Sequence, residues 1–449
     1  MKEKIIHLFY KFISFFTELF PRSGSRIIDA FIFTLLGNPV PGSVIRAINQ
    51  NRLRQIRNLK KICVLGDMNI GDAIIVQGAI LGLRHFFPDA RIDYVINRAA
   101  RDLLAEDPEI SNLFAVYSGS TLPAEDDIRA INEVLARTKY DLVFNFCPFI
   151  SGREIAISSG TRFISYHGVA AAVIRAAKDP WAKNHMLYQT HQFIEGLFSG
   201  SRGSGERDFR GGHIYLPAKA VDEAAQFMNG SNLDPRRPRI FFNPDASCRF
   251  TRMPLDIQVS LLKRLAELPI DILLGAGHSK KGIEFSILAA LPEAVSRNIK
   301  VVPAATSIDV YAAIIDHCDV YITGDTGPLH IAAARKHSGT KGHKFRNQTA
   351  VFSIFGATPP RIYGYDSRLP GFFPANQDAP SHVYAAPSSF RNMACIAKKF
   401  ITCDPGCFFG SLDIGEIISG IRSYLNIDGQ MRQRSVNAIT AGLNAGLHE

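Results

Sequence analysis

Long apolar runs and paired cysteines are the first features that this 449-residue chain lacks. The phenylalanine-rich segment 5–20 is interrupted by Lys11 and Glu18, and it is shorter than the roughly 20 residues that a bilayer span needs. No small-residue cleavage site follows it cleanly, so a signal peptide is not expected. The seven cysteines form no even framework. This excludes a disulfide scaffold and favours the reducing cytoplasm.

A metal-binding cysteine cluster is also incomplete. Cys395, Cys403 and Cys407 gather late in the chain, and three thiolates can ligate zinc. The fourth ligand is missing, however, and a single C-x-x-x-C spacing is a weak signal. We therefore interpret these cysteines as loop packing and expect neither a metal nor a cofactor.

The charge of the chain is concentrated at its beginning. Residues 1–61 contain eleven Lys or Arg and three Asp or Glu, a net of +8 within a formal total of +10. The remainder has an ordinary globular composition, and its length suits two domains. Residues 1–58 are therefore predicted to form a basic, amphipathic appendage.

Two interpretations of this appendage remain open. Apolar aromatic faces beside a basic run suit an anionic membrane surface, which residues 1–61 would contact as a peripheral anchor. Alternatively, its helices pack on the protein's own core and the basic run is a solvated face. Nucleic acid is not an expected partner, because no reader motif is present and the apolar faces suit phosphate tracking poorly.

The stretch that follows the appendage predicts a βαβ unit. Residues 61–72 read K-I-C-V-L-G-D-M-N-I-G-D, an apolar strand and a glycine loop, and an apolar-periodic helix over Ala73–Phe87 and a second strand over Arg91–Ile96 follow. Open α/β sheets bind their ligands at the carboxyl ends of such strands. The loop does not match the dinucleotide pattern G-x-G-x-x-G. Asp72 can serve there as a base or simply cap the helix.

A second strand-to-helix junction lies at residues 322–334, which read I-T-G-D-T-G-P-L-H-I-A-A-A. Gly324 and Gly327 allow a sharp turn, and Asp325 and Thr326 can cap the helix. Its N–H groups and positive dipole end favour an anion such as phosphate. The same pattern is typical of an ordinary capped junction, but His330, one turn into the helix, favours a ligand site.

Taken together, these motifs resemble glycosyltransferase family 9, whose best-known members are the lipopolysaccharide heptosyltransferases. The resemblance rests on the early G-D…G-A-I-x-x-L-R-x-x-F-P-D-A-R-I-D series and on D-T-G-P-L-H with the later F-G-A-T-P-P, from about Lys60 to Leu425. It implies the GT-B architecture, two Rossmann-like α/β domains facing each other across a cleft. We expect an acceptor domain at 59–215, a nucleotide-sugar donor domain at 236–425 and a tail at 426–449.

The resemblance also implies roles for individual residues. Asp72 would be the general base, with Gly71 in the loop at the acceptor site. The donor diphosphate would bind residues of two loops: Ser247, Arg249, Arg252, Asp325, Thr326, Gly327 and His330. Met253-Pro254 stands where the family usually has Trp-Pro, which leaves the register of the basic residue open.

Two further loops bear on specificity. Relatives commonly place a glutamate near the nucleoside after the strand at 271–275, but here the nearest is Glu284, so adenine is not implied by the residues. Residues 337–348 add a basic loop that can reach an anionic acceptor or remain solvated.

The expected activity is inverting transfer of a sugar to a lipid-linked or polysaccharide acceptor such as lipopolysaccharide core. The resemblance to the family suggests heptose from ADP-heptose as the donor. No Asp-x-Asp pair occurs, which fits a metal-independent transferase. The enzyme would work in the cytoplasm, either free or on the inner face of the membrane. Two alternatives are a GT-B nucleotide-sugar epimerase or hydrolase and a non-catalytic membrane-surface binding protein.

Overall fold

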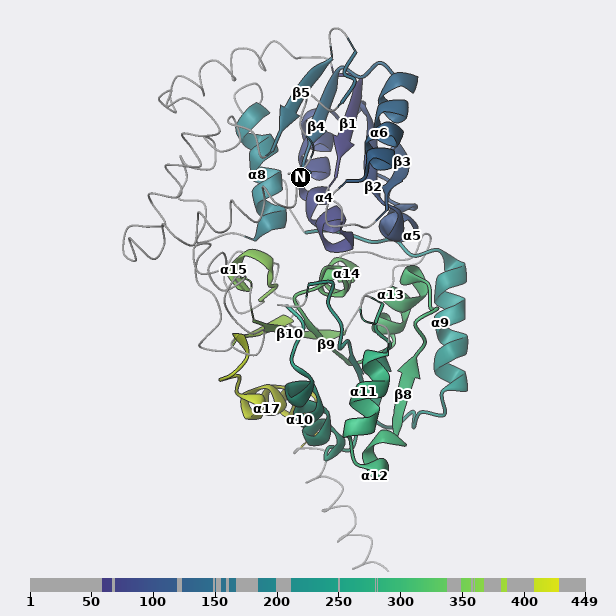
Figure 1. The fold of residues 1–449 in the computed structure, drawn as a ribbon, viewed down its shortest axis with the longest axis vertical. Helices are drawn as coiled ribbons and strands as arrows, with labels where there is room; N and C mark the ends of the chain where they lie inside the picture. The colour runs from purple at the N-terminus through teal and green to yellow at the C-terminus, as the bar shows by residue number, and fades with distance from the viewer. Residues whose placement is uncertain are drawn as a thin grey trace, which may run out of the picture.

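The protein is described by a computed structural model over most of residues 59–427 (Figure 1). The described ranges are 59–66, 69–118, 123–147, 150, 155–158, 161–166, 185–198, 211–248, 251–278, 280, 282–336, 349–356, 358, 360–366, 381–385 and 408–427. The appendage at 1–58, Arg249, the basic loop 337–348 and the three late cysteines lie outside these ranges.

The first lobe is built on a five-stranded parallel sheet with strand order β3-β2-β1-β4-β5. Its elements are β1 (Lys61–Leu65), α4 (Ile70–Phe86), β2 (Arg91–Asn97), η1 (Arg98–Ala100), α5 (Arg101–Leu104), β3 (Asn112–Tyr117), α6 (Glu125–Arg137), β4 (Leu142–Asn145), β5 (Arg162–Ser165) and α8 (Met186–Phe198). The predicted βαβ opening is confirmed. The strands β1, β2 and β4 are almost entirely buried, as the covered strands of parallel sheets are, and the edge strand β3 is partly exposed.

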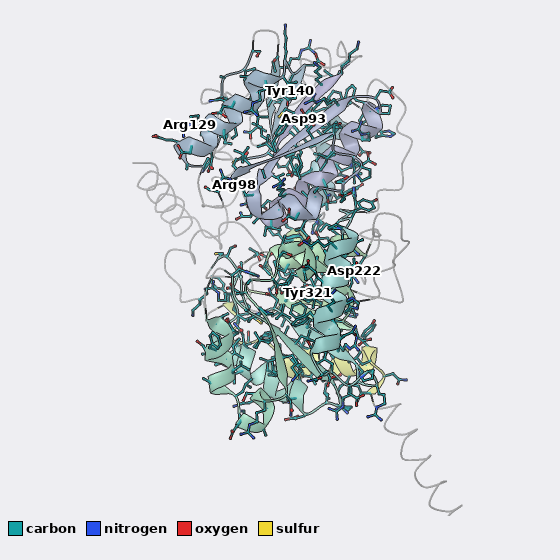
Figure 2. All side chains as sticks on the ribbon, turned by 90° about the vertical axis from the view of Figure 1, so that its right-hand side faces the viewer. Asp93, Arg98, Arg129, Tyr140, Asp222 and Tyr321 are labelled. Carbon is teal, nitrogen blue, oxygen red and sulfur yellow. The ribbon has the colours of Figure 1, made fainter. Side chains whose placement is uncertain are left out.

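A buried carboxylate ties three of these strands together. Asp93 on β2 is fully buried, accepts a 2.7 Å hydrogen bond from the Tyr140 hydroxyl before β4, and is paired with Arg91 at 2.8 Å. Asn112 on β3 donates to it as well, at 2.7 Å. Figure 2 shows Asp93 and Tyr140 within the same lobe. These bonds satisfy a charge that would otherwise be costly to bury.

Helix α4 begins earlier than the sequence predicts. The helix was expected from Ala73, but it starts at Ile70, so Gly71 and Asp72 lie in its first turn and not in the preceding loop. Asn69 provides the extended N-cap residue. Along its side, α8 approaches closely because Gly78 has no side chain: a Cβ there would lie 2.1 Å from the Leu187 carbonyl oxygen. This contact places the start of α8 against the first lobe.

The second lobe contains a six-stranded parallel sheet with order β11-β10-β9-β6-β7-β8. Its elements are β6 (Arg239–Phe242), α10 (Leu255–Ala266), β7 (Asp271–Gly275), α11 (Ile283–Ala290), α12 (Glu293–Ser296), β8 (Ile299–Val302), α13 (Ile308–Asp316), β9 (Val320–Gly324), α14 (Gly327–Arg335), β10 (Ala350–Phe355), α15 (Pro360–Tyr363), β11 (Ser381–Ala385) and α17 (Ile414–Tyr424). In both sheets the strand order reverses beside the first strand, as in doubly wound folds. The α/β prediction with two such sheets is therefore confirmed.

Residues 211–217 connect the lobes and are held by both. The backbone N–H of His213 donates to Gln77 of α4 at 3.0 Å, and its ring lies 3.1 Å from Asp107. Arg335, at the end of α14, donates to the carbonyl of Ile214 at 2.5 Å and pairs with Asp316. The connection therefore bonds to α4 and to α14 at adjacent positions.

Helix α9 (Ala218–Gly230) follows this connection and packs against α13 of the second lobe. The division into domains at 59–215 and 236–425 stays a proposal, with α9 falling between the two ranges. Among the described residues, no helix is both long and apolar enough to cross a bilayer.

Candidate active site

The loops singled out by the sequence meet where the two lobes touch. In the first lobe, α4 follows β1, beside the point at which the strand order reverses. In the second lobe, β6 and β9 are neighbouring strands, so the loop after β6 and the turn after β9 lie at the same edge of the sheet. These loops are in contact, because a Cβ on Gly324 would lie 3.2 Å from the Thr251 carbonyl oxygen. Ligands of doubly wound sheets bind at such positions.

The starts of α4 and α14 abut, as Figure 1 shows at the junction of the lobes. A Cβ on Gly327 would lie 3.3 Å from the Ile70 Cβ and 3.4 Å from the Gly71 nitrogen. A Cβ on Gly71 would lie 2.6 Å from the Cδ2 atom of His330. Two glycines therefore allow two helix N-termini to meet, and the positive ends of both dipoles lie at one place.

Asp72 lies in the first turn of α4, at this junction. Burial raises the pKa of its carboxyl group, and a hydrogen bond from the Asn69 amide, 2.8 Å from Oδ2, acts in the opposite direction. A raised pKa makes a carboxylate a better proton acceptor near neutral pH. Asn69 also fixes the direction of one oxygen.

Asp325 is a second carboxylate within electrostatic reach of the first. Its pKa is raised to about 6, mainly by burial and also by the negative charge of Asp72, while the hydroxyl of Thr358, which donates to Oδ2, acts in the opposite direction. The negative charge of Asp72 therefore acts on Asp325, so carboxylates from the two lobes lie within electrostatic reach of each other.

Thr326 occupies the N-cap position of α14, with extended backbone angles. The side-chain capping that the sequence allows is not formed: Thr326 makes no cap hydrogen bond, and the Asp325 carboxylate accepts from Thr358. Asp325 is therefore engaged with the loop after β10. Because no side chain caps α14, an anion can accept from its first turn.

His330 is buried in the second turn, at 4% exposure, and lies against Gly71. Burial lowers its pKa to about 4, so the ring is neutral at pH 7. Its Nδ1 atom lies 2.8 Å from the Tyr365 hydroxyl. His330 can thus act at this site as a hydrogen-bond donor but brings no positive charge.

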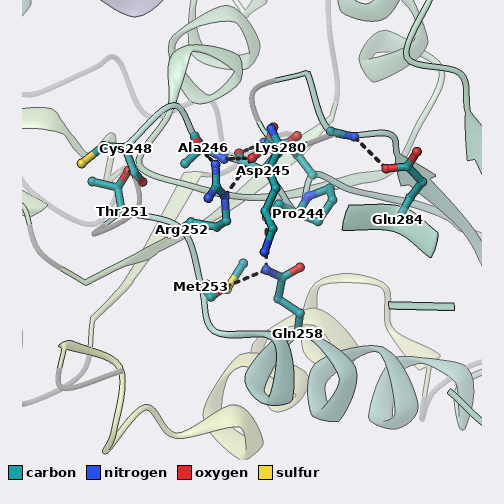
Figure 3. Close-up of polar contacts among 12 residues, drawn as sticks. Pro244, Asp245, Ala246, Cys248, Thr251, Arg252, Met253, Gln258, Lys280 and Glu284 are labelled. Atoms are coloured by element: carbon teal, nitrogen blue, oxygen red, sulfur yellow. Dashed lines mark hydrogen bonds and ion pairs between the residues drawn. The ribbon is translucent and has the colours of Figure 1, made fainter. Parts of the chain in front are cut away.

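The loop after β6 holds the other predicted donor residues (Figure 3). Ser247 is exposed. Arg252 is paired with Asp245 at 2.9 Å and donates to the Ala246 carbonyl at 2.6 Å. Asp245 also accepts from the Lys280 backbone N–H at 3.1 Å. Much of the Arg252 charge is therefore balanced within its own loop, so it contributes less to a diphosphate site than an unpaired cation.

Glu284 reaches the loop after β7 despite its distance in the sequence. It lies in the first turn of α11, is buried, and accepts a 3.2 Å hydrogen bond from the Gly277 backbone N–H. A carboxylate is therefore present beside this glycine loop, where the sequence suggested a gap.

Sequence reasoning missed Tyr365, His185 and Asp245. Tyr365 is separated from His330 by 35 residues, and neither it nor His185 belongs to a motif. No local signal points to them, because only the fold brings them together. Asp245, by contrast, precedes Arg252 by seven residues, and the possibility of a pair within the loop was visible in the sequence.

A pocket of about 510 Å³ lies elsewhere, between α10 and α17. Its lining includes Arg264, Ser419, Arg422 and Asn426. None of the predicted site residues lines it. Asp72, Asp325 and His330 come together at the starts of α4 and α14, and not at this pocket.

Comparison with known proteins relates this geometry to an enzyme family. Residues 161–364 match the model of glycosyltransferase family 9 (heptosyltransferase). Lipopolysaccharide heptosyltransferase 2 of Escherichia coli K12 is 24% identical over 288 residues, which cover 61% of this chain and 80% of that protein. Lipopolysaccharide heptosyltransferase 3 of the same strain is 22% identical over 303 residues, covering 64% and 80%.

Solved structures share the fold. A family 9 glycosyltransferase from Veillonella parvula aligns with a TM-score of 0.59 at 18% identity, covering 82% of this chain and 97% of that chain. The heptosyltransferase WaaC of E. coli, solved with ADP, aligns with a TM-score of 0.50 at 15% identity, covering 81% and 99%. The two parallel sheets therefore form the GT-B fold. With the D-T-G-P-L-H turn set against Asp72, these findings indicate a glycosyltransferase whose residues 161–364 match glycosyltransferase family 9, the heptosyltransferase family.

Proposed function

We propose that the protein transfers heptose from ADP-heptose, with inversion, to lipopolysaccharide core or a related glycan acceptor. The observation that carries this proposal is the abutment of two helix starts, one bearing Asp72 and the other the Thr326–Gly327 turn and His330. Displacement of a diphosphate needs a base that accepts the proton of the attacking hydroxyl. It also needs hydrogen-bond donors, such as those of a helix N-terminus, that stabilise the leaving anion. Relatives named as heptosyltransferases support the choice of sugar.

In the proposed reaction Asp72 removes the proton from an acceptor hydroxyl. The oxygen attacks the anomeric carbon of the donor from the face opposite the diphosphate, a new C–O bond forms, and the bond to the diphosphate oxygen breaks. The raised pKa of Asp72 suits the first step. No metal ion has a part in this scheme.

Negative charge accumulates on the leaving nucleoside diphosphate. The N-terminus of α14 at Thr326–Gly327 and a neutral N–H donor on His330 would stabilise it there. We place the donor against the second lobe, with Ser247, Arg249 and Arg252 at its margin, and the acceptor against the first lobe near Gly71. Arg252 would act mainly by shaping its loop, because Asp245 already pairs with it.

The appendage completes the proposal. Residues 1–61 would hold the enzyme on the anionic inner face of the cytoplasmic membrane, where a lipid-linked acceptor is found. Sedimentation with vesicles containing anionic lipid, compared with neutral vesicles, tests this part separately. Equal binding to both vesicle types would contradict it.

The activity is tested with a panel of labelled ADP-, UDP- and GDP-linked sugars and a heptose-deficient membrane extract, with Asp72→Asn as control. Transfer of heptose from ADP-heptose to lipid, lost in the variant, supports the proposal. Transfer of another sugar would correct the donor. Release of free sugar or an epimer without transfer would favour the hydrolase or epimerase alternative and overturn the proposal.

A further inference from the structure

His330 meets a different environment at each ring nitrogen. Its Cδ2 and Nε2 atoms would lie 2.6 Å and 3.3 Å from a Cβ on Gly71, so this edge faces the start of α4. Its Nδ1 atom, on the other side, lies 2.8 Å from the Tyr365 hydroxyl. The nitrogen that faces the helix junction is therefore not the one that contacts Tyr365.

Tyr365 is held firmly in this position. It is 3% exposed, and its ring centroid lies 4.2 Å from that of His185, which immediately precedes α8 of the first lobe. The His330 ring lies 5.6 Å from Tyr365, in an edge-to-face arrangement. The two histidine rings also lie 6.2 Å apart, so Tyr365 packs in one cluster with a histidine from each lobe. Packing alone would be served equally well by phenylalanine, so the hydroxyl is the informative part of this residue.

The protonation of the pair follows from its burial. The His330 ring is neutral at pH 7, and burial, together with the negative charge of Asp325, raises the pKa of Tyr365 above its usual value. The phenol therefore keeps its proton. A neutral imidazole nitrogen is a better acceptor than a phenol oxygen, so the shared hydrogen bond runs from Tyr365 to Nδ1. The proton of the ring is then on Nε2.

We propose that Tyr365 is a positioning residue: its hydroxyl fixes His330 in the tautomer whose Nε2–H points at the junction of α4 and α14, where it donates to the leaving diphosphate. The inference deepens the proposed function and rests on it for the identity of the anion. It assigns to Tyr365 no contact with the substrate. The opposite tautomer would present a lone pair to a phosphate oxygen, which repels where a donor attracts.

The tautomer is measured directly by nitrogen NMR on protein labelled with ¹⁵N-histidine. The His330 signals are assigned by their loss in His330→Gln. We expect Nε2 to be protonated and Nδ1 unprotonated in the unmodified protein, and a mixture of tautomers in Tyr365→Phe. A proton on Nδ1 in the unmodified protein, or an unchanged tautomer in Tyr365→Phe, would overturn the inference.

Kinetics provide the second readout. Tyr365→Phe should lower kcat by about tenfold to hundredfold, because a misdirected donor no longer stabilises developing charge, and should change the KM for the donor little. The matched control is Tyr384→Phe, which removes another buried tyrosine hydroxyl in the same lobe, on β11. It should leave kcat and the His330 tautomer unchanged. An equal fall in kcat for both variants would indicate a structural role and contradict the inference.

The two proposals fail in different ways. The NMR measurement needs no turnover, so a protein that transfers no sugar from any donor in the panel would refute the proposed function and still report the tautomer. A protein that transfers sugar with the same kcat in Tyr365→Phe would refute only the role of Tyr365.

Discussion

The helices α4 and α14 begin in similar ways and carry different chemistry. Each follows a buried strand of a parallel sheet, each has an extended N-cap residue, Asn69 or Thr326, and in neither does that residue make a side-chain cap hydrogen bond. Asp72 lies in the first turn of α4, whereas the first turn of α14 contains no acidic residue. One start therefore bears a base, and the other is suited to an anion.

Burial strengthens the chemical difference between the two helix starts. A carboxylate at a helix N-terminus is normally stabilised in its charged form, yet burial raises the pKa of Asp72. On the other side His330 is neutral and brings a donor without a charge. The backbone geometry of the two helix starts is alike. Their different roles therefore come from their side chains and from burial, which raises the pKa of Asp72 and keeps His330 neutral.

The largest expected effect comes from removing the base on α4. Asp72→Asn should lower turnover by about 10²–10⁴-fold, because the acceptor hydroxyl then keeps its proton in the attack. Donor affinity, measured by calorimetry, should change little. The control Asp102→Asn alters an exposed carboxylate in the first turn of α5 and should leave turnover intact. Turnover close to that of the unmodified enzyme in Asp72→Asn would remove Asp72 from the mechanism.

The next effect concerns the contact between the helix starts. Gly71→Ala places a Cβ 2.6 Å from the His330 ring and 3.3 Å from the Gly327 Cα, so the ring or the helix starts must shift. A displacement on the order of 1 Å can reduce turnover about 10²-fold. Gly230→Ala is the matched control, because no atom lies within 4 Å of a Cβ at that position. Equal activity of the two variants would show that the contact between the helices is not needed for catalysis.

A smaller effect is expected in stability at Asp325. The folded pKa of about 6 lies above the unfolded value of 3.8, so the buried charge destabilises the fold fully above pH 6, and the cost disappears as pH falls toward 4. Asp325→Asn should therefore stabilise the protein by about 1–2 kcal/mol at pH 7.5 and much less at pH 5. Denaturant unfolding at both values checks this. The exposed Asp256→Asn, in the first turn of α10, should show no such gain, and a gain at Asp325 that is independent of pH would contradict the argument.

The smallest effect concerns His213, in the connection between the lobes. Burial lowers the pKa of His213, but the hydrogen bond and charge of Asp107 outweigh it and raise the pKa above the unfolded value of 6.5. The resulting stability is fully present below pH 6.5 and is lost as pH rises through the folded pKa. His213→Gln should thus cost about 1 kcal/mol at pH 5.5, with a smaller cost at pH 8.5. A cost that grows with pH would have the wrong sign.

Much of the fold could be predicted from the sequence, because its signals are local. Apolar runs predicted the strands β1, β2 and β9, and glycine turns marked the junctions that follow β1 and β9. The start of α4 was missed by three residues, since Ile70 and Gly71 resemble a loop when their tertiary contacts are unknown. The packing of α9 on α13 had no local signal, because it depends on how the lobes are joined.

The candidate site was predictable in part. Asp72, Thr326 and His330 belong to motifs, so their neighbourhood could be inferred from the resemblance. The contact of Tyr365 with His330 and His185 could not, because the three rings come from separate segments. The pairing of Arg252 with Asp245 also depends on the conformation of a loop, which composition does not determine. Local patterns therefore indicated where the chemistry lies but not how its charges are balanced.

In the proposed mechanism, the starts of α4 and α14 form one site for a nucleoside diphosphate. A crystal structure of the protein with ADP tests this most directly. We expect the phosphates to accept hydrogen bonds of about 3 Å from the first turn of α14, with Asp72 facing them from α4. ADP bound only elsewhere, for example in the α10–α17 pocket with Arg264 and Arg422, would contradict it.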